Sequence, residues 1–240
     1  MEIHEKLLHL PLFPPDLQDE GQPPQLQQPM TQADLCDYPF AIAYMDELVA
    51  RPKTAPDVLL AVQHPPTVTL GRRGGAEHIA QKDLQVHEVA RGGSVTWHAP
   101  GQLVIYPIVQ LNQQVGPWGK GPLGDLPAFV RLLEQCIAAT CRHFGVPALQ
   151  KIGHSGVWLN ETRKIASIGL GLRNGWTFHG LALNVNPDVQ QFALTPCGLA
   201  GVTMTSLHEV CTEMQLPKPD IADVERDLLE RLGKVLRRKV

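Results

Sequence analysis

The chain lacks the cysteine spacing of a disulfide framework or a zinc site. Its five cysteines are odd in number, scattered and never arranged as a CxxC pair; they are Cys36, Cys136, Cys141, Cys197 and Cys211. The ten histidines form no HxH or HExxH pattern. We therefore expect neither a metal ion nor disulfides, and this cysteine usage fits a reducing cytoplasm.

Charge of one sign and long apolar runs are also scarce. The net charge of −3 gives no basic excess of the kind that nucleic-acid-binding proteins show. No apolar stretch approaches the ~20 residues that a membrane-spanning helix needs. Residues 1–12 carry acidic side chains and lack both an apolar core and an Arg-rich pattern, which argues against a secretion signal or a transit peptide. We expect a cytoplasmic protein that binds neither nucleic acid nor a membrane.

The length and composition suit one folded domain. With 240 residues, of which 43% are hydrophobic, the chain can bury a single large core. Residues 11–37 are rich in Pro and Gln, a composition that resists both helix and sheet. We therefore divide the chain into a Pro/Gln-rich N-terminal arm, residues 1–37, and a folded domain, residues 38–240.

The hydrophobic periodicity predicts an α+β fold. Helical spacing is found at residues 38–49, 125–144 and 221–236. In the first of these helices, the apolar face is expected to contain Phe40, Ala43, Tyr44 and Leu48. Shorter runs typical of strands occur at residues 58–63, 67–70, 86–90, 103–109, 157–159, 164–172 and 177–185.

A glycine-rich segment between two predicted strands is the first candidate for a functional site. It reads Arg91-Gly92-Gly93-Ser94-Val95-Thr96-Trp97-His98-Ala99-Pro100-Gly101-Gln102. Its glycine amides are unobstructed by side chains and lie near the cation of Arg91 and the imidazole of His98. Such an arrangement is suited to bind a carbonyl group or an anion. A strand turn or bulge needs the same conformational freedom, so the glycine pair by itself is also consistent with a structural role.

Cys197 and Lys164 are candidates for covalent chemistry. Cys197 lies between Pro196 and Gly198, on a predicted turn where a thiol is accessible, and it needs a neighbouring base to become a nucleophile. Lys164 lies in an apolar strand, where loss of water would favour its neutral amine and let it accept the thiol proton.

Other interpretations of these residues remain open. His98 and His179 compete with Lys164 for the role of base, because a Cys–His pair is the commoner arrangement. Alternatively, Cys197 is a core residue and Lys164 faces solvent at a sheet edge.

In order and spacing, these residues resemble the octanoyltransferases of lipoate biosynthesis. The signature of Arg91, Gly92, Gly93, Thr96, Trp97, His98, Gly101, Gln102, Val104 and Tyr106 is followed by Gly156-Val157-Trp158, Lys164-Ile165-Ala166-Ser167-Ile168-Gly169, His179-Gly180-Leu181-Ala182-Leu183-Asn184-Val185-Asn186 and Pro196-Cys197-Gly198. These blocks span residues 56–210 approximately. Two features depart from the family pattern: Ala99 stands where the family usually has Gly, and the N-terminal arm is longer.

The resemblance implies a fold and a set of site residues. The fold is that of the biotin and lipoate protein ligases, a single α+β domain with a curved mixed sheet flanked by helices, and residues 38–240 would be the acyltransferase catalytic domain. Cys197 would carry the acyl group as a thioester and Lys164 would transfer protons. An oxyanion contact is expected from backbone amides near Gly198 or Gly92. The acyl site would be lined by Arg91, Gly92, Gly93, Ser94, Val95, Thr96, Trp97, His98, Ser167, Ile168, Gly169, His179, Gly180, Leu181 and Ala182.

The resemblance also implies the partners. The donor would be octanoyl-acyl carrier protein, and the acceptors would be lysines on lipoyl domains of 2-oxoacid dehydrogenase E2 subunits and on the glycine cleavage H protein. No cofactor is expected.

Two rival functions are consistent with the sequence. The first is an ATP-dependent lipoate or biotin protein ligase, which would not need Cys197. The second is a non-catalytic module that binds acyl carrier protein through Arg72, Arg73 and Arg163.

Overall fold

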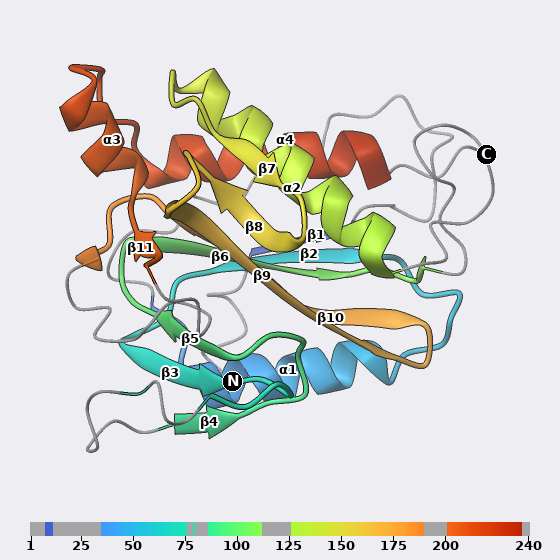
Figure 1. Cartoon of the computed structure of the whole chain (residues 1–240). Coiled ribbons are helices and arrows are strands. Elements are labelled where there is room, and N and C mark those ends of the chain that lie inside the picture. The colour runs from blue at the N-terminus through green and yellow to red at the C-terminus, as the bar shows by residue number, and fades with distance from the viewer. Residues whose placement is uncertain are drawn as a thin grey trace, which may run out of the picture.

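Two β-sheets of unequal size form the framework of the protein. The computed structural model describes residues 8–11, 35–75, 79, 86–111, 126–189 and 201–236. The large sheet has the strand order β1-β2-β6-β10-β9-β8-β7, with β11 paired to β9, and the small sheet has the order β4-β3-β5 (Figure 1).

The strands are β1 Leu8–Pro11, β2 Val58–Val62, β3 Thr67–Leu70, β4 Val86–Glu88, β5 Val95–His98, β6 Gln102–Ile108, β7 Leu149–Lys151, β8 His154–Trp158, β9 Arg163–Arg173, β10 Trp176–Asn184 and β11 Thr203–Met204. The helices are α1 Tyr38–Val49, α2 Leu126–His143, α3 Leu207–Glu213 and α4 Ile221–Leu236.

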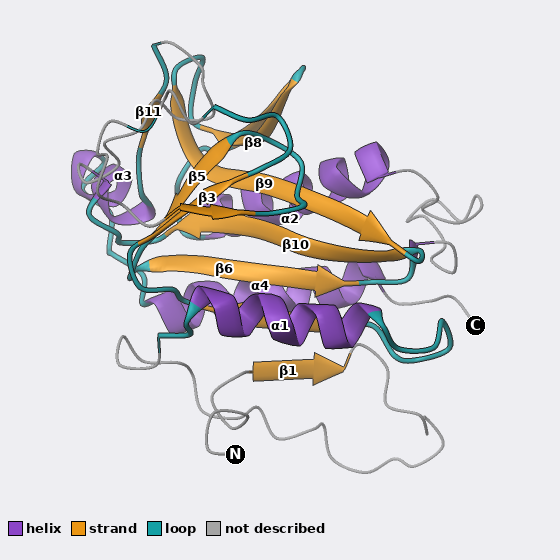
Figure 2. Cartoon of the chain, turned by 90° about the horizontal axis from the view of Figure 1, so that it is seen from below, coloured by secondary structure: helices purple, strands orange, loops and turns teal. Residues whose placement is uncertain are grey.

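The large sheet is mixed and is covered by helices on both faces. Its neighbouring strands run antiparallel except for β11, which runs parallel to β9. The helices α2 and α4 pack on one face, where Phe129, Leu133 and Leu228 are fully buried. The helix α1 covers the other face and lies beside β6 in Figure 2. The predicted mixed sheet flanked by helices is confirmed.

Every residue of the central strands β6 and β10 is buried. Because both of their faces are covered, most of their side chains are apolar, and the polar exceptions Gln102, Thr177, His179 and Asn184 are buried as well. On the α1 side, β9 and β10 present small residues such as Gly169, Gly180 and Ala182. Chain segments that pack over these residues can approach the sheet closely or leave a space.

The long helices lie where their periodicity predicts them. α2 ends just before Gly145, whose φ of +82° suits the left-handed residue that commonly follows a helix. The predicted apolar face of α1 is only partly right, however: Leu48 is buried and Phe40 and Tyr44 are partly buried, but Ala43 is exposed, and the prediction left out Ala41 and Met45, which are buried. Residues 38–45 are apolar almost all round, so the sequence does not define one buried face.

The sequence analysis missed five short elements, namely β1, β5, β7, β11 and α3. β1 falls inside the predicted N-terminal arm and pairs with β2 at the edge of the large sheet. The rest of the arm up to residue 34 lies outside the described residues, and the boundary at residue 38 stays a prediction. Within the described ranges, none of the helices has the length and apolar composition needed to cross a membrane.

Candidate functional site

The glycine-rich segment is held against the large sheet by its own backbone and by Arg91. The amide of Gly92 donates a hydrogen bond to the carbonyl of Leu170 on β9, with an N···O distance of 2.8 Å. Arg91 is buried and donates to the hydroxyl of Thr69 at 2.7 Å and to its carbonyl at 3.0 Å. A Cβ on Gly169 would lie 2.9 Å from the carbonyl oxygen of Gly92, so the close approach of loop and strand requires glycine there. Because the Gly92 amide is already used, it is not a free donor for an oxyanion.

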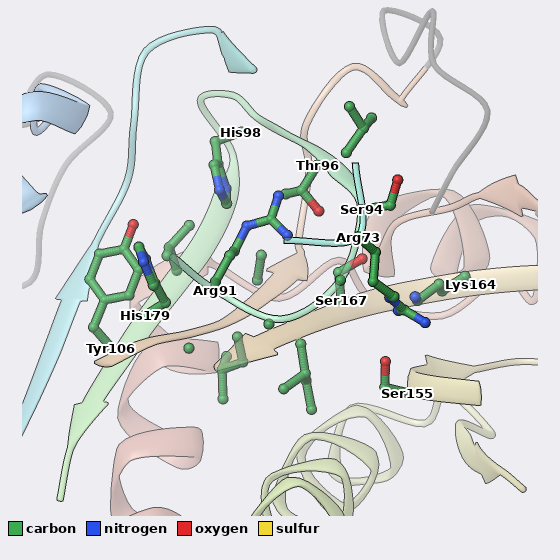
Figure 3. A pocket seen from close by; sticks show the side chains of 18 of the residues that line it. Arg73, Arg91, Ser94, Thr96, His98, Tyr106, Ser155, Lys164, Ser167 and His179 are labelled. Atoms are coloured by element: carbon green, nitrogen blue, oxygen red, sulfur yellow. The ribbon is translucent and has the colours of Figure 1, made fainter. Parts of the chain in front are cut away.

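A cavity of about 300 Å³ lies between this loop and the large sheet (Figure 3). It is lined by Tyr38, Arg73, Arg91, Gly93, Ser94, Val95, Thr96, His98, Val104, Tyr106, Gly153, His154, Ser155, Lys164, Ser167, Ile168, Gly169, His179, Gly180, Leu181 and Ala182. All the described candidate residues from the sequence are among them, except Gly92 and Trp97. Trp97 points into a small apolar cluster with Val68 and Val95.

The cavity has an exposed end and a buried end. Arg73 and Ser155 are exposed at the end that contains Lys164, whereas Tyr106 is buried at the other end, where the ring of Tyr38 lies 5.8 Å from that of His98 (Figure 3). Sequence analysis assigned no role to Tyr38 or to residues 153–155. No sequence signal marks them, because tertiary structure brings them to the cavity: Tyr38 begins helix α1, and residues 153–155 lie where β7 turns into β8.

Lys164 lies at the exposed end of the cavity but is itself buried. Only 2% of the residue is accessible, and its Nζ atom lies over the Trp158 ring, 5.2 Å from the ring centroid. Gly156 lies directly under its side chain, since a Cβ there would be 2.6 Å from Cε of Lys164. The alternative of a solvent-facing lysine at a sheet edge is therefore wrong.

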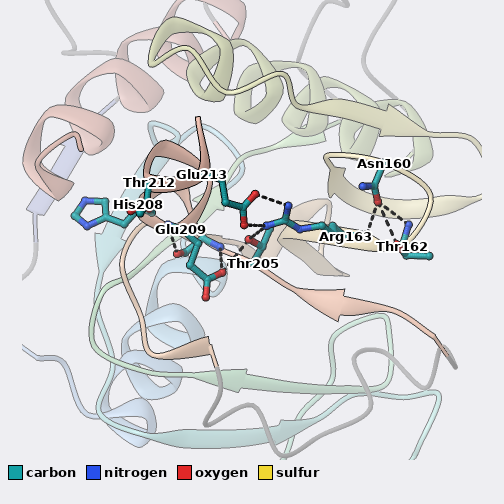
Figure 4. A network of polar contacts seen from close by, with 9 residues as sticks. Asn160, Thr162, Arg163, Thr205, His208, Glu209, Thr212 and Glu213 are labelled. Atoms are coloured by element: carbon teal, nitrogen blue, oxygen red, sulfur yellow. Dashed lines mark hydrogen bonds and ion pairs between the residues drawn. The ribbon is translucent and has the colours of Figure 1, made fainter. Parts of the chain in front are cut away.

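The strand that carries Lys164 is anchored to β11 and α3. The amide of Thr205 donates to the carbonyl of Lys164 at 2.9 Å. Arg163 donates to both carboxylate oxygens of Glu213 at 2.7 Å and to the hydroxyl of Thr205 at 2.9 Å (Figure 4). Thr205 in turn donates to Glu209, which takes part in the capping box of α3. Arg163 is thus engaged by a carboxylate of its own chain, which removes it from the predicted surface for an acidic partner.

Cys197 lies outside the described residues, but the two ends of the segment that contains it are fixed. Asn184 at the end of β10 donates from its amide nitrogen to the carbonyl of Thr205 at 2.9 Å. The amide of His208 donates to the carbonyl of Val185 at 2.9 Å. The segment therefore leaves β10 and returns through β11 beside Lys164, and Cys197 precedes Thr203 by six positions.

The two histidines proposed as alternative bases are buried and uncharged. Burial, with a smaller contribution from His64, lowers the pKa of His98 well below its usual range. Burial, followed by the charges of Arg91 and Arg173, lowers the pKa of His179 to about 3. Such weakly basic imidazoles are poor acceptors of a thiol proton at neutral pH. In the described ranges, no three His, Cys, Asp or Glu side chains are placed to hold a metal ion.

Comparison with known proteins defines the class of this protein. The family model for the lipoyl protein ligase A/B catalytic domain matches residues 37–233. Among solved structures, lipoate-protein ligase A bound with ATP has a TM-score of 0.64 at 15% identity, covering 85% of this chain and 86% of that chain. A bi-partite lipoate protein ligase from Thermoplasma acidophilum has a TM-score of 0.60 at 14% identity, covering 85% and 84%. These two likenesses support the fold.

Curated relatives narrow the class. An octanoyltransferase from Syntrophotalea carbinolica is 42% identical over 182 residues, which cover 74% of this chain and 82% of the relative. An octanoyltransferase from Geobacter metallireducens is 36% identical and covers 81% of this chain and 87% of its own. The chain therefore belongs to the lipoyl protein ligase A/B catalytic-domain family and, within it, to the octanoyltransferases, which are acyltransferases.

Proposed function

We propose that this protein transfers an octanoyl group from octanoyl-acyl carrier protein to a lysine of a lipoyl domain, through a thioester on Cys197. Its octanoyltransferase relatives support octanoyl transfer in lipoate biosynthesis. The observation that carries the proposal is the placement of Lys164: it is a buried lysine at the exposed end of the cavity, and its strand β9 pairs with β11, which follows the segment containing Cys197.

In the first half-reaction, the amine of Lys164 takes the proton of the Cys197 thiol. The thiolate attacks the carbonyl carbon of the donor thioester, and the bond between that carbon and the pantetheine sulfur breaks. The ammonium of Lys164 returns its proton to the departing pantetheine thiolate. Cys197 then holds the octanoyl group, and Lys164 has given up the proton that it took from the thiol.

In the second half-reaction, the amine of the acceptor lysine attacks the Cys197 thioester and forms an amide. Lys164 accepts the proton that this nitrogen loses and passes it to the departing thiolate of Cys197. Exchange between two thioesters is nearly thermoneutral, whereas the amide is more stable than the thioester. The second step therefore drives the reaction, and neither ATP nor a metal ion enters the balance.

The acceptors that fit this proposal are lipoyl domains of 2-oxoacid dehydrogenase E2 subunits and the glycine cleavage H protein. Each must present its lysine at the exposed end of the cavity, because Lys164 lies there and the other end is closed.

Intact-protein mass spectrometry with octanoyl-acyl carrier protein and no ATP tests the covalent step. An octanoyl adduct is expected on the wild type and on Cys36→Ala, and not on Cys197→Ala. Cys36 is a suitable control because burial raises the pKa of its thiol to about 11, so it stays protonated. Absence of any adduct, with transfer to a lipoyl domain only when ATP and free octanoate are supplied, would identify an ATP-dependent ligase instead.

The Lys164→Arg variant tests the proton transfers. A guanidinium keeps the positive charge but cannot act as a base near neutral pH. Transfer of octanoate to a lipoyl domain should fall at least 100-fold, while the melting temperature, measured in parallel, reports on folding. Wild-type turnover by a folded Lys164→Arg protein would remove Lys164 from the mechanism.

A further inference from the structure

The buried end of the cavity is polar, although the tail of an acyl chain is apolar. Tyr106, His98 and His179 line this end, and they are 3%, 6% and 3% exposed. We call these three side chains the acceptor wall. Figure 3 shows them at the opposite end of the cavity from Lys164 and Ser155.

The hydrogen-bond network fixes the tautomer of His98. The amide nitrogen of Asn184 donates to the carbonyl of Thr205, so its oxygen faces Gln102 and accepts from Nε2 of Gln102 at 2.9 Å. Nε2 of Gln102 also donates to the carbonyl of Trp97, which leaves Oε1 of Gln102 facing Nδ1 of His98 at 2.7 Å. An amide oxygen can only accept, so Nδ1 of His98 carries the hydrogen. Since burial keeps this ring neutral, Nε2 has a free electron pair.

A second network orients the hydroxyl of Tyr106. Nδ1 of His64 lies 2.6 Å from the carbonyl oxygen of Cys36 and must donate to it. Burial lowers the pKa of His64 to about 4, so at neutral pH its Nε2 is an acceptor, and it lies 2.7 Å from the hydroxyl of Tyr106. Tyr106 therefore donates its hydrogen to His64, and its oxygen retains lone pairs for another donor.

His179 adds a third polar group. Its Nδ1 is buried and has no hydrogen-bond partner among the described residues. Its φ of +56° lies in the left-handed region, within strand β10, where a non-glycine residue costs about 1–3 kcal/mol. Backbone strain of this kind persists where the surrounding structure holds a side chain in place. Here the surrounding structure holds the imidazole of His179 at the buried end of the cavity.

We propose that the acceptor wall sets the upper length limit of the acyl chain and discriminates by the polarity of the chain's tip. This proposal rests on the proposed function, in which the carbonyl of the acyl group reacts beside Lys164; the same cavity then leads the tail toward the wall. A saturated chain long enough to reach the wall covers the acceptors with a methyl group and separates them from water without replacing their hydrogen bonds. A chain of equal length that ends in a hydroxyl can donate a hydrogen bond to the wall. It therefore avoids the free-energy cost of burying unsatisfied acceptors.

Binding of two isosteric ligands tests the proposal independently of catalysis. S-decyl and S-(9-hydroxynonyl) pantetheine thioethers have tails of equal length, and neither can transfer an acyl group. Calorimetry on the wild type should show the hydroxyl ligand binding at least tenfold more tightly. In Tyr106→Phe and His98→Leu this preference should shrink to threefold or less. Ser155→Ala, which removes a hydroxyl at the exposed end, should keep the wild-type preference.

Chain-length selectivity provides the second measurement. The ratio of kcat/KM for decanoyl to that for octanoyl thioesters of acyl carrier protein should rise at least tenfold in Tyr106→Phe or His98→Leu, and should be unchanged in Ser155→Ala. Equal binding of the two thioethers by the wild type, or the same preference in all variants, would overturn the acceptor wall. A wild type that binds the thioethers as expected but forms no octanoyl adduct would instead overturn the proposed function.

Discussion

At the scale of single residues, Gly156 leaves the space that the side chain of Lys164 occupies. Its φ is +107°, and a Cβ at this position would lie 2.4 Å from the carbonyl oxygen of Ala166 and 2.6 Å from Cε of Lys164. Neither distance is tolerable, so an added methyl group must displace the lysine or the strand. The position of the ammonium in the cavity thus depends on a residue that performs no chemistry.

The variant Gly156→Ala should therefore lower kcat at least tenfold, because the base moves away from the reacting atoms. Gly153→Ala is the matched control: its φ of +79° imposes similar backbone strain, but its Cβ would meet nothing within 4 Å. Steady-state kinetics and melting temperatures of both variants separate strain from displacement. Equal losses of kcat in the two variants would show that backbone strain alone is responsible.

The sequence pointed to the candidate site residues more readily than to the residues that hold them in place. Lys164 could be singled out because a lysine in an apolar strand is unusual, and the resemblance assigned it a role. Its burial against Trp158 depends on a strand partner, which local sequence does not specify. Likewise Tyr106 belongs to the recognised signature, but its orientation is set by His64, which lies 42 positions earlier in the chain.

At the scale of secondary-structure elements, α4 carries a buried carboxyl group. Glu225 is 6% exposed, and burial raises its pKa to about 7 from a usual value of 4.5. A raised pKa means that the folded state binds the proton more tightly than the unfolded state. The stability that this provides is fully present below about pH 4.5 and is lost as the pH rises through 7.

The variant Glu225→Gln should remove this dependence. Relative to the wild type, its free energy of unfolding should increase by about 3 kcal/mol between pH 4.5 and pH 8, which is the difference in pKa expressed as energy. Denaturant unfolding at several pH values measures it. Glu47→Gln, which changes an exposed carboxylate on α1, controls for the loss of surface charge. A constant difference between Glu225→Gln and the wild type across this range would contradict the expectation.

The elements that could be predicted are those whose pattern is local. α2 and α4 each show one apolar face, and their bounds agree with the sequence to within one or two residues. The short strands β1 and β7 contain too few residues for an alternating pattern, and each exists through its pairing with a neighbour. The strand order of the large sheet is likewise a non-local property, and the sequence analysis did not predict it; the family resemblance implied only that the sheet is mixed.

At the scale of the whole molecule, two exposed cations lie beside the open end of the cavity. Arg72 and Arg73 occupy the turn after β3, and Arg73 lines the cavity itself. An acidic donor such as acyl carrier protein would be attracted to them electrostatically, and salt would shorten the range of this attraction. The position of these cations agrees with the route by which a thioester would reach Lys164.

The affinity for octanoyl-acyl carrier protein should consequently fall as the salt concentration rises. Replacing both Arg72 and Arg73 with Gln should weaken binding at low salt at least fivefold and flatten the dependence on salt. Arg131→Gln, an exposed change on α2 across the large sheet, serves as the control for net charge. Dissociation constants measured at several NaCl concentrations test this prediction. A salt-independent wild-type affinity would count against docking of acyl carrier protein at this turn.

The bonds from Asn184 to Thr205 and from His208 to Val185 have an evolutionary consequence. They close the segment between β10 and β11 at its base, so the fold does not depend on the residues within it for that closure. Doubling the length of a closed loop costs only about 0.6 kcal/mol. Changes of length in this stretch therefore cost the fold little, whereas Cys197 within it stays necessary for the proposed thioester.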